Sequence, residues 1–255
     1  MNRKKPTKLH AEPPPRRQFL ETCSVGMAMA CAGHALAAEH PDGATRYEPA
    51  TLVDTTGRPL GCDDLEVNRE YIFHYPFRST PCFLINLGEA RDGGLAMHTA
   101  NGARYTWRGG IGSRKSVVAF SAICAHKLSH PSPEVSFIGY REQPVGFYNR
   151  SKDAIERRSG VIQCCSEQSL YDPAQGAQVL SGPAPQPLAA IELRETDGKL
   201  QAIGVYGGAL FEQYFERFGN RLMITHRGES YALPVEQETQ VVPGDQYTRN
   251  RISCG

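Results

Sequence analysis

Two stretches, residues 123–130 (ICAHKLSH) and residues 162–172 (IQCCSEQSLYD), decide how this chain is interpreted. The first places a thiol and an imidazole two residues apart, directly after an apolar run that we predict to be a strand. The second contains two adjacent cysteines among polar residues. Thiolates and imidazoles are ligands for soft and borderline metal ions, and such cysteines also carry redox chemistry. The two stretches therefore predict a metal or redox site built from two separate loops.

Short β-like segments separated by turn residues surround both stretches. The chain contains 25 glycines and 18 prolines, a composition typical of a turn-rich, mostly β protein. We therefore predict an all-β fold in which the two stretches form loops at the end of the strands. The predicted strands are 65–67, 71–75, 83–87, 104–107, 116–120, 190–193, 200–203 and 205–206.

Length and charge limit the classes of protein that this chain belongs to. The 255 residues suffice for one domain of ordinary size with extensions, or for two small domains. Lys and Arg number 28 and Asp and Glu 27, so no overall basic field exists and we expect no nucleic-acid partner. After residue 40, no apolar run approaches the roughly 20 residues that a membrane-spanning helix needs.

Residues 1–38 are expected to be an export signal and not part of the fold. Residues 16–20 (RRQFL) resemble the twin-arginine motif, an apolar segment follows at 23–32, and residues 35–37 (ALA) suit cleavage before Ala38. The twin-arginine route moves folded proteins, often with a cofactor already inserted. The signal therefore predicts a periplasmic protein with a cofactor, or one held at the periplasmic face of the inner membrane by an uncleaved signal.

Two further segments interrupt or follow the β pattern. Residues 127–160 are expected to form an insertion, within which 135–138 and 145–148 pair as strands. Beyond residue 207, apolar side chains recur at helical spacing, which predicts a short amphipathic helix closed by Gly219. We expect its apolar stripe to pack on the β domain, with a partner-docking face as the alternative. The stripe consists of Leu210, Phe211, Tyr214, Phe215 and Phe218. The predicted division is 1–38, 39–207 and 208–255.

With these features, residues 60 to 207 resemble the Rieske iron–sulfur family, whose two loops read C-x-H-x-x-C and C-x-x-H. The residues 169–172 (SLYD) and 182–188 (GPAPQPL) add to the resemblance, which is to the Rieske subunits of respiratory quinol-oxidising complexes. It implies a Rieske-like antiparallel β sandwich carrying a 2Fe–2S cluster, with two Cys on one iron and two His on the other. Cys124 and His126 are then the ligands from the first loop.

The second loop departs from the family pattern because it contains no histidine, so two registers arise. If Cys165 is the ligand, the histidine position falls on Gln168. If the Ser-x-Tyr sequence that follows sets the register, the ligand is Cys164 and the histidine position is Glu167. We prefer the first register, because a Gln codon is one nucleotide from His and a Glu codon two. Cys164 is then a neighbour of the cluster and not a ligand.

This substitution leaves the fourth ligand open. Gln168 offers a hard amide oxygen where the family has an imidazole. The alternatives are a cluster completed by Gln168, by water or by another histidine, or no cluster at all. His130 is the nearest further imidazole in sequence, and we expect it to be a surface or supporting residue. The long spacing between the loops is also unlike respiratory Rieske subunits.

The resemblance also assigns supporting residues around the ligands. Ser169 and Tyr171 correspond to residues whose hydroxyl groups donate hydrogen bonds to cluster and ligand sulfurs and raise the reduction potential. In the preferred register, the two cysteines of the family's supporting disulfide correspond to Ser129 and Glu167. That disulfide is therefore absent, and we expect the two loops to be held together less firmly.

The resemblance implies one-electron transfer by an oxidoreductase subunit, which makes or breaks no substrate bond and is not a stand-alone catalyst. Its partners would be redox proteins or a quinol-oxidising membrane complex, with His126 as the only imidazole left to accept a proton. The alternative is a degenerate Rieske fold without a cluster that serves as a structural or assembly subunit. A Rieske ferredoxin for a ring-hydroxylating oxygenase conflicts with the export signal. A zinc site of Cys124, His126, Cys164 and Cys165 is a further candidate.

Overall fold

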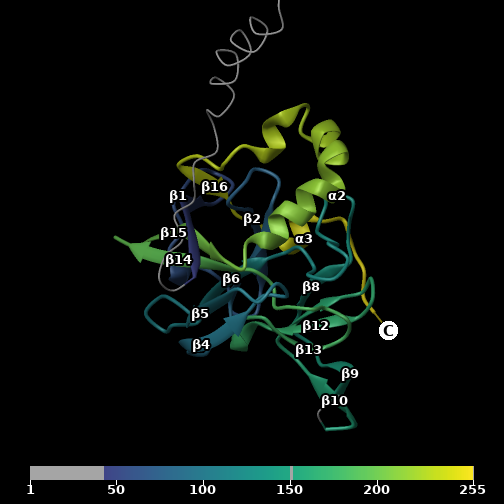
Figure 1. Ribbon diagram of the computed structural model, residues 1–255. Coiled ribbons are helices and arrows are strands. Elements are labelled where there is room, and N and C mark those ends of the chain that lie inside the picture. The colour runs from purple at the N-terminus through teal and green to yellow at the C-terminus, as the bar shows by residue number, and fades with distance from the viewer. Residues whose placement is uncertain (1–42, 150–151, 255) are drawn as a thin grey trace, which may run out of the picture. The chain divides into compact units, whose positions relative to one another are not determined.

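The computed structural model describes residues 43–149 and 152–254, so the predicted export signal lies outside the described residues (Figure 1). Strands dominate the described part, which confirms the prediction of a mostly β fold. Among these residues, no helix combines the length and apolar character that crossing a membrane requires.

The largest sheet has eight strands in the order β16-β1-β15-β14-β6-β3-β2-β17. Neighbours in it are antiparallel except β1 and β16, which run parallel. Segments 200–203 and 205–206, predicted as separate strands, form the single strand β15. The strands are β1 (Ala44–Val53), β2 (Glu70–His74), β3 (Pro81–Asn86), β6 (Val117–Ser121), β14 (Ala190–Thr196), β15 (Lys199–Tyr206), β16 (Glu238–Gln240) and β17 (Val242–Pro243).

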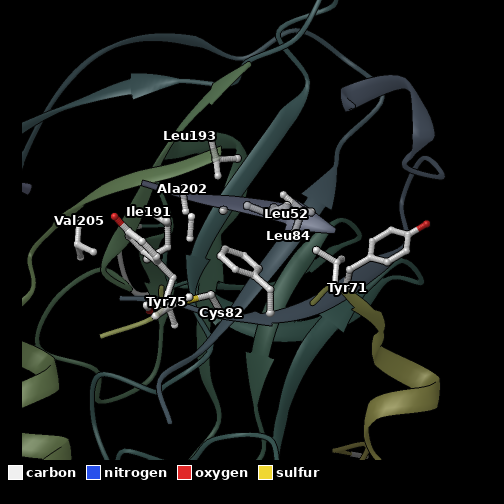
Figure 2. Close-up of a cluster of buried hydrophobic side chains, with 14 of the residues drawn as sticks. Leu52, Tyr71, Tyr75, Cys82, Leu84, Ile191, Leu193, Ala202 and Val205 are labelled. Atoms are coloured by element: carbon white, nitrogen blue, oxygen red, sulfur yellow. Dashed lines mark hydrogen bonds between the residues drawn. The ribbon is translucent and has the colours of Figure 1, made fainter. Parts of the chain in front are cut away.

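Strands β6 and β3 of this sheet are buried on both faces, which is why each is a nearly continuous apolar run. Successive side chains of a strand point to opposite faces. Cys82 and Leu84 of β3 therefore join one core cluster, with Leu52 and Ile191 (Figure 2). Their neighbours, such as Phe83, join a second cluster on the other face, and this second cluster also contains the cysteines of the candidate site.

The second sheet has four strands in the order β13-β12-β11-β8, and it carries the second cysteine stretch. The predicted pairing of 135–138 with 145–148 is wrong. β8 pairs instead with β11, whose four residues are all buried, whereas β9 pairs with β10 in a hairpin with exposed residues on both strands. The strands are β8 (Ile138–Arg141), β9 (Val145–Asn149), β10 (Ala154–Arg158), β11 (Val161–Cys164), β12 (Ser169–Asp172) and β13 (Gln178–Ser181).

Smaller elements complete the described part. Two short pairs of strands are antiparallel β4 with β5, and parallel β7 with β18. Their bounds are β4 (Asp92–His98), β5 (Arg104–Gly109), β7 (Val135–Ser136) and β18 (Asn250–Arg251). The short helical turns are η1 (Cys62–Asp64), η2 (Pro173–Gln175), η3 (Glu229–Ala232) and α3 (Gly244–Tyr247).

Helix α2 (Ala209–Thr225) confirms the predicted amphipathic helix but runs past Gly219, where we expected it to end. A glycine inside a helix costs about 1 kcal/mol relative to alanine. Burial of Leu222 one turn later offsets this cost. Tyr214 and Phe211 are almost fully buried against the β domain, so the aromatic stripe packs on the fold as predicted.

Candidate metal centre

Two loops approach each other beside the second core cluster. The first loop (residues 122–130) follows β6 and is closed by hydrogen bonds between the backbones of Cys124 and Ser129, and of Leu128 and Cys124, each 2.9 Å. The second loop (residues 165–168) joins β11 to β12, with Cys164 opposite Ser169 in the ladder. Strands from two different sheets thus deliver one cysteine each.

Cys124 and Cys164 lie in the same buried cluster, where their thiols shift each other's pKa, and both residues are 1% exposed. The hydroxyl oxygen of Tyr171 is 3.3 Å from Cys124 Sγ and accepts a hydrogen bond from the Ala125 amide. Donation by the Cys164 thiol, by the Tyr171 hydroxyl and by two backbone amides lowers the pKa of Cys124 to about 6, although burial opposes this. The same contact and burial raise the pKa of Cys164. The pair is therefore arranged to hold one negative charge on Cys124.

The same two loops also bring together a second pair of candidate metal ligands, an imidazole and a carboxylate. His126 Nδ1 lies 3.5 Å from Glu167 Oε2, and Lys127 Nζ lies 3.0 Å from Glu167 Oε1. The geometry at His126 Nδ1 is not that of a hydrogen bond, so this buried nitrogen has no hydrogen-bond partner among the described residues. The pair is more open to solvent than the two thiols, because the side chain of Glu167 is 46% exposed.

The prediction that Cys165 is a metal ligand is wrong, because Cys165 forms a disulfide with Cys254. Adjacent residues of a strand point to opposite sides, so only one of two neighbouring cysteines can face the first loop. That residue is Cys164, which ends β11 on the core side. The codon argument for the other register contained no geometric information. Gln168 loses its basis as the fourth ligand, and its side chain is exposed in the turn.

The register that begins at Cys164 places Glu167 at the position of the missing histidine. It also moves the predicted disulfide positions from Ser129 and Glu167 to Ser129 and Ser166. The hydroxyl oxygens of these two serines are 2.6 Å apart and share a hydrogen bond. Ser169, which we predicted to support the site, is 1% exposed, and within residues 43–149 and 152–254 its buried Oγ has no hydrogen-bond partner.

His130 is a packing residue of the first loop. Its Nδ1 lies 2.9 Å from the carbonyl oxygen of Leu128, and its ring packs edge-on against Tyr214 and Phe218 of α2. Burial lowers its pKa, which keeps the ring neutral in this apolar contact. His130 thus fixes the first loop to the helix, consistent with the supporting role that we expected.

The sequence interpretation missed Cys254 as the partner of Cys165. The further cysteine at position 254, in a chain that we expected to be exported, was the available signal. Spacing alone does not identify a disulfide partner, and the two residues are 89 positions apart. The structure brings them together because residues 250–251 pair with 135–136.

The four candidate ligands form two pairs and not one group. Among the residues that the structure describes, no three or more Cys, His, Asp or Glu side chains surround one point as a single metal ion requires. The zinc site is also wrong because it required Cys165. The donors form two pairs, with one member of each pair from each loop, which matches a cluster that has two irons. Ser169 Oγ and His126 Nδ1 are buried polar atoms that lack the partner a cluster and its iron would provide.

No family model matches this sequence. Among solved structures, the chain is similar to the soluble domain of Rieske protein II (soxF) from Sulfolobus acidocaldarius. The two are 26% identical, and the match covers 54% of this chain and 68% of that chain with a TM-score of 0.38. Because this TM-score describes a loose superposition, the roles of the individual residues rest on the side-chain geometry of this chain alone.

Proposed function

We propose that this chain binds a 2Fe–2S cluster between its two loops and transfers single electrons as a subunit of a redox complex. The observation that carries this proposal is the pairing of Cys124 with Cys164 and of His126 with Glu167 across the loops. The thiol pair would hold one iron, and the imidazole and carboxylate would hold the other. When bound, the cluster supplies one-electron redox chemistry.

The protein would stabilise the charge of this site with buried hydroxyl groups. Tyr171 is placed to donate to the sulfur of Cys124, and Ser169 has a buried hydroxyl without another acceptor. Donors to sulfur stabilise the more negative, reduced state. Burial of the two thiols keeps water from the sulfur ligands, whereas Glu167 lies at the surface, where a partner has access.

Glu167 distinguishes this site from one with two imidazoles. A carboxylate adds a negative charge where imidazole is neutral, so we expect a lower reduction potential than in a site with two histidines. Lys127 offsets part of this charge through its ion pair with Glu167. We propose redox proteins of the periplasm, or of the periplasmic face of the inner membrane, as partners. A quinol-oxidising membrane complex is the second candidate, with His126 as the proton acceptor.

Metal analysis of the exported protein tests the proposal. Protein from a bacterial strain with working cluster assembly should be red-brown, with about two irons and two sulfides per chain and a Rieske-like electron paramagnetic signal. Cys124→Ser should lose the iron, whereas Cys62→Ser, at a buried free cysteine outside the site, should retain it. Colourless, iron-free wild-type protein would favour the alternative, a degenerate fold that serves as a structural or assembly subunit. Glu167 in place of histidine is the observation behind that alternative.

A further inference from the structure

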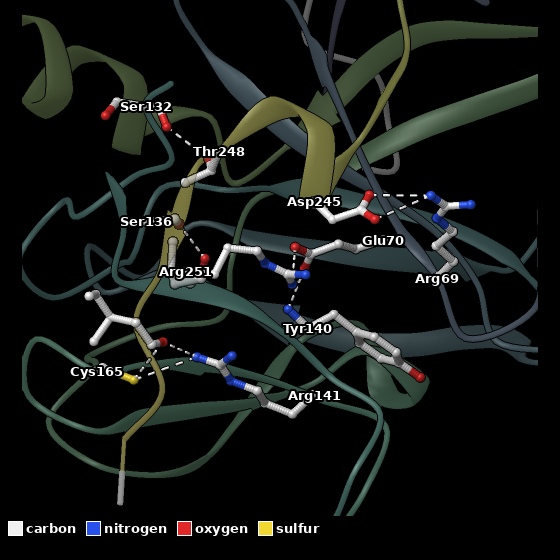
Figure 3. Close-up of polar contacts among 12 residues, drawn as sticks. Arg69, Glu70, Ser132, Ser136, Tyr140, Arg141, Cys165, Asp245, Thr248 and Arg251 are labelled. Atoms are coloured by element: carbon white, nitrogen blue, oxygen red, sulfur yellow. Dashed lines mark hydrogen bonds and ion pairs between the residues drawn. The ribbon is translucent and has the colours of Figure 1, made fainter. Parts of the chain in front are cut away.

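Residues 248–254, the last that the structure describes, form a segment that we call the C-terminal strap. It runs along residues 132–136, which directly follow the first loop. Figure 3 shows the two segments side by side, with the Thr248 hydroxyl donating to the carbonyl oxygen of Ser132 at 2.8 Å. The backbone bonds join Arg249 to Pro133 at 3.0 Å, Asn250 to Glu134 at 3.2 Å and Ile252 to Ser136 at 2.9 Å.

Side chains from the sheets hold the middle of the strap. Arg251 forms an ion pair with Glu70, a buried carboxylate that also accepts a hydrogen bond from the Tyr140 amide (Figure 3). Arg141 donates a hydrogen bond to the carbonyl oxygen of Ile252. These contacts fix the strap to strands β2 and β8, so its position does not depend on the second loop.

The end of the strap reaches the second loop through the disulfide between Cys254 and Cys165. Cys165 directly follows Cys164, the thiol that contacts the first loop. A path of hydrogen bonds and one covalent bond therefore runs from the continuation of the first loop, through the strap, to the second loop.

The direct surface links between the loops are weaker than this path. Beside the buried contact of Cys124 with Cys164, two such links are the hydrogen bond between Ser129 and Ser166 and the ion pair between Lys127 and Glu167. Both lie at exposed positions, where water competes for the same groups and salt screens the charges. The disulfide is a covalent bond, so neither competition by water nor screening by salt weakens it. The strap thus adds a covalent restraint on the second loop to these exposed links.

We propose that the C-terminal strap is a clamp that positions the second loop against the first. Cys165 and Cys254 act as positioning residues. They fix the backbone next to Cys164 and are not themselves among the candidate metal ligands. The consequence of this clamp for a cluster rests on the proposed function, whereas the clamp itself rests on the disulfide and the paired segments. Opening the disulfide should let the second loop move away from Cys124.

A water-soluble phosphine opens the clamp chemically. The sulfur–sulfur bond breaks, and each sulfur takes up one electron and one proton to become a thiol. The phosphine gives up the two electrons and takes the oxygen of water as phosphine oxide. The substitution Cys254→Ser also removes the disulfide, and it leaves all four candidate metal ligands unchanged.

The accessibility of Cys124 reports the clamp, because this residue is 1% exposed and contacts Cys164, which directly precedes the second loop. Cluster-free full-length chain is treated with iodoacetamide, and the alkylation of tryptic peptide 116–127, which contains Cys124 and no other cysteine, is followed by mass spectrometry. We expect alkylation to be about tenfold faster in Cys254→Ser, as local opening becomes easier. The matched control is Cys82→Ala, which removes a buried thiol of β3 and should leave the rate within about twofold.

Equal alkylation rates in wild type and Cys254→Ser would overturn the clamp, as would an equal acceleration in Cys82→Ala. If Cys254→Ser does not fold, phosphine-treated wild type supplies the same comparison. In iron-loaded protein, Cys254→Ser should also release iron to a chelator faster than wild type. Iron-free wild type would overturn the proposed function, while the alkylation rates would still decide on the clamp.

Discussion

The hydroxyl oxygens of Ser129 and Ser166 lie 2.6 Å apart and join the two loops by a hydrogen bond. In the register set by Cys164, these are the positions where the Rieske family, which the sequence resembles, has its supporting disulfide. The covalent restraint of this chain lies one residue earlier, at Cys165, and leads to the strap. A reversible link therefore joins the loops directly, and a covalent link joins them through a third segment.

Replacing Glu167 by histidine should raise the reduction potential of the iron-loaded protein. The change removes one negative charge beside the cluster, and ligand charge shifts the potential of such centres by on the order of 100 mV. Protein-film voltammetry measures the effect. Glu216→His, at an exposed position of α2, is the control and should leave the potential unchanged. An unchanged potential in Glu167→His would show that Glu167 does not bind iron.

Ser169→Ala should stabilise the cluster-free protein against unfolding and lower the reduction potential of the cluster-bound protein. Without a cluster, the buried Oγ has no partner, and a buried hydroxyl in that state costs about 1 kcal/mol or more. The variant should therefore unfold at higher urea concentration than wild type when both are iron-free. With a cluster, the variant should have a lower potential, because a donor to sulfur is lost. A potential equal to that of wild type would remove Ser169 from the site.

Gly182→Ala should disturb the second loop. Gly182 has φ of +89°, and an added Cβ would lie 2.6 Å from the Gln168 carbonyl oxygen and 2.6 Å from the Ser169 Cα. Gly198→Ala is a matched control, because its φ is +70° and a Cβ there would meet nothing within 4 Å. Both variants carry a backbone strain of about 1 kcal/mol, and the steric conflict should add at least as much at Gly182. Urea unfolding compares the two, and equal losses of stability would contradict the predicted contact.

His74→Gln should flatten the acid dependence of stability. Burial, with His226 nearby, lowers the pKa of His74 to about 4 from the 6.5 of an exposed histidine. Between these two values the unfolded chain binds a proton that the folded chain does not, so stability falls as the pH decreases from about 6.5 to about 4. The loss from this one group is about 3 kcal/mol. Urea unfolding at several pH values measures it, and a slope in His74→Gln equal to that of wild type would contradict the prediction.

The residues that determine the β fold are visible in the sequence. Apolar runs such as 83–87 and the spacing of Phe211 and Tyr214 predicted strands and a helix that the structure contains. They did so because a strand buried on both faces is apolar throughout, whereas a helix packed on one face has apolar residues about every 3.6 positions. The pairing of 135–138 was predicted wrongly, because a short strand has several potential partners and only the packed sheet selects one.

The sequence by itself also determined which chemistry is available, since it contains one Cys-x-His loop and one loop with adjacent cysteines. It left two registers open, and only the tertiary structure decided that Cys164 faces Cys124 while Cys165 bonds to Cys254. The reason is geometric. Adjacent side chains of a strand point in opposite directions, and which direction leads to the first loop depends on how β11 packs between β8 and β12. Local sequence carries no record of that orientation.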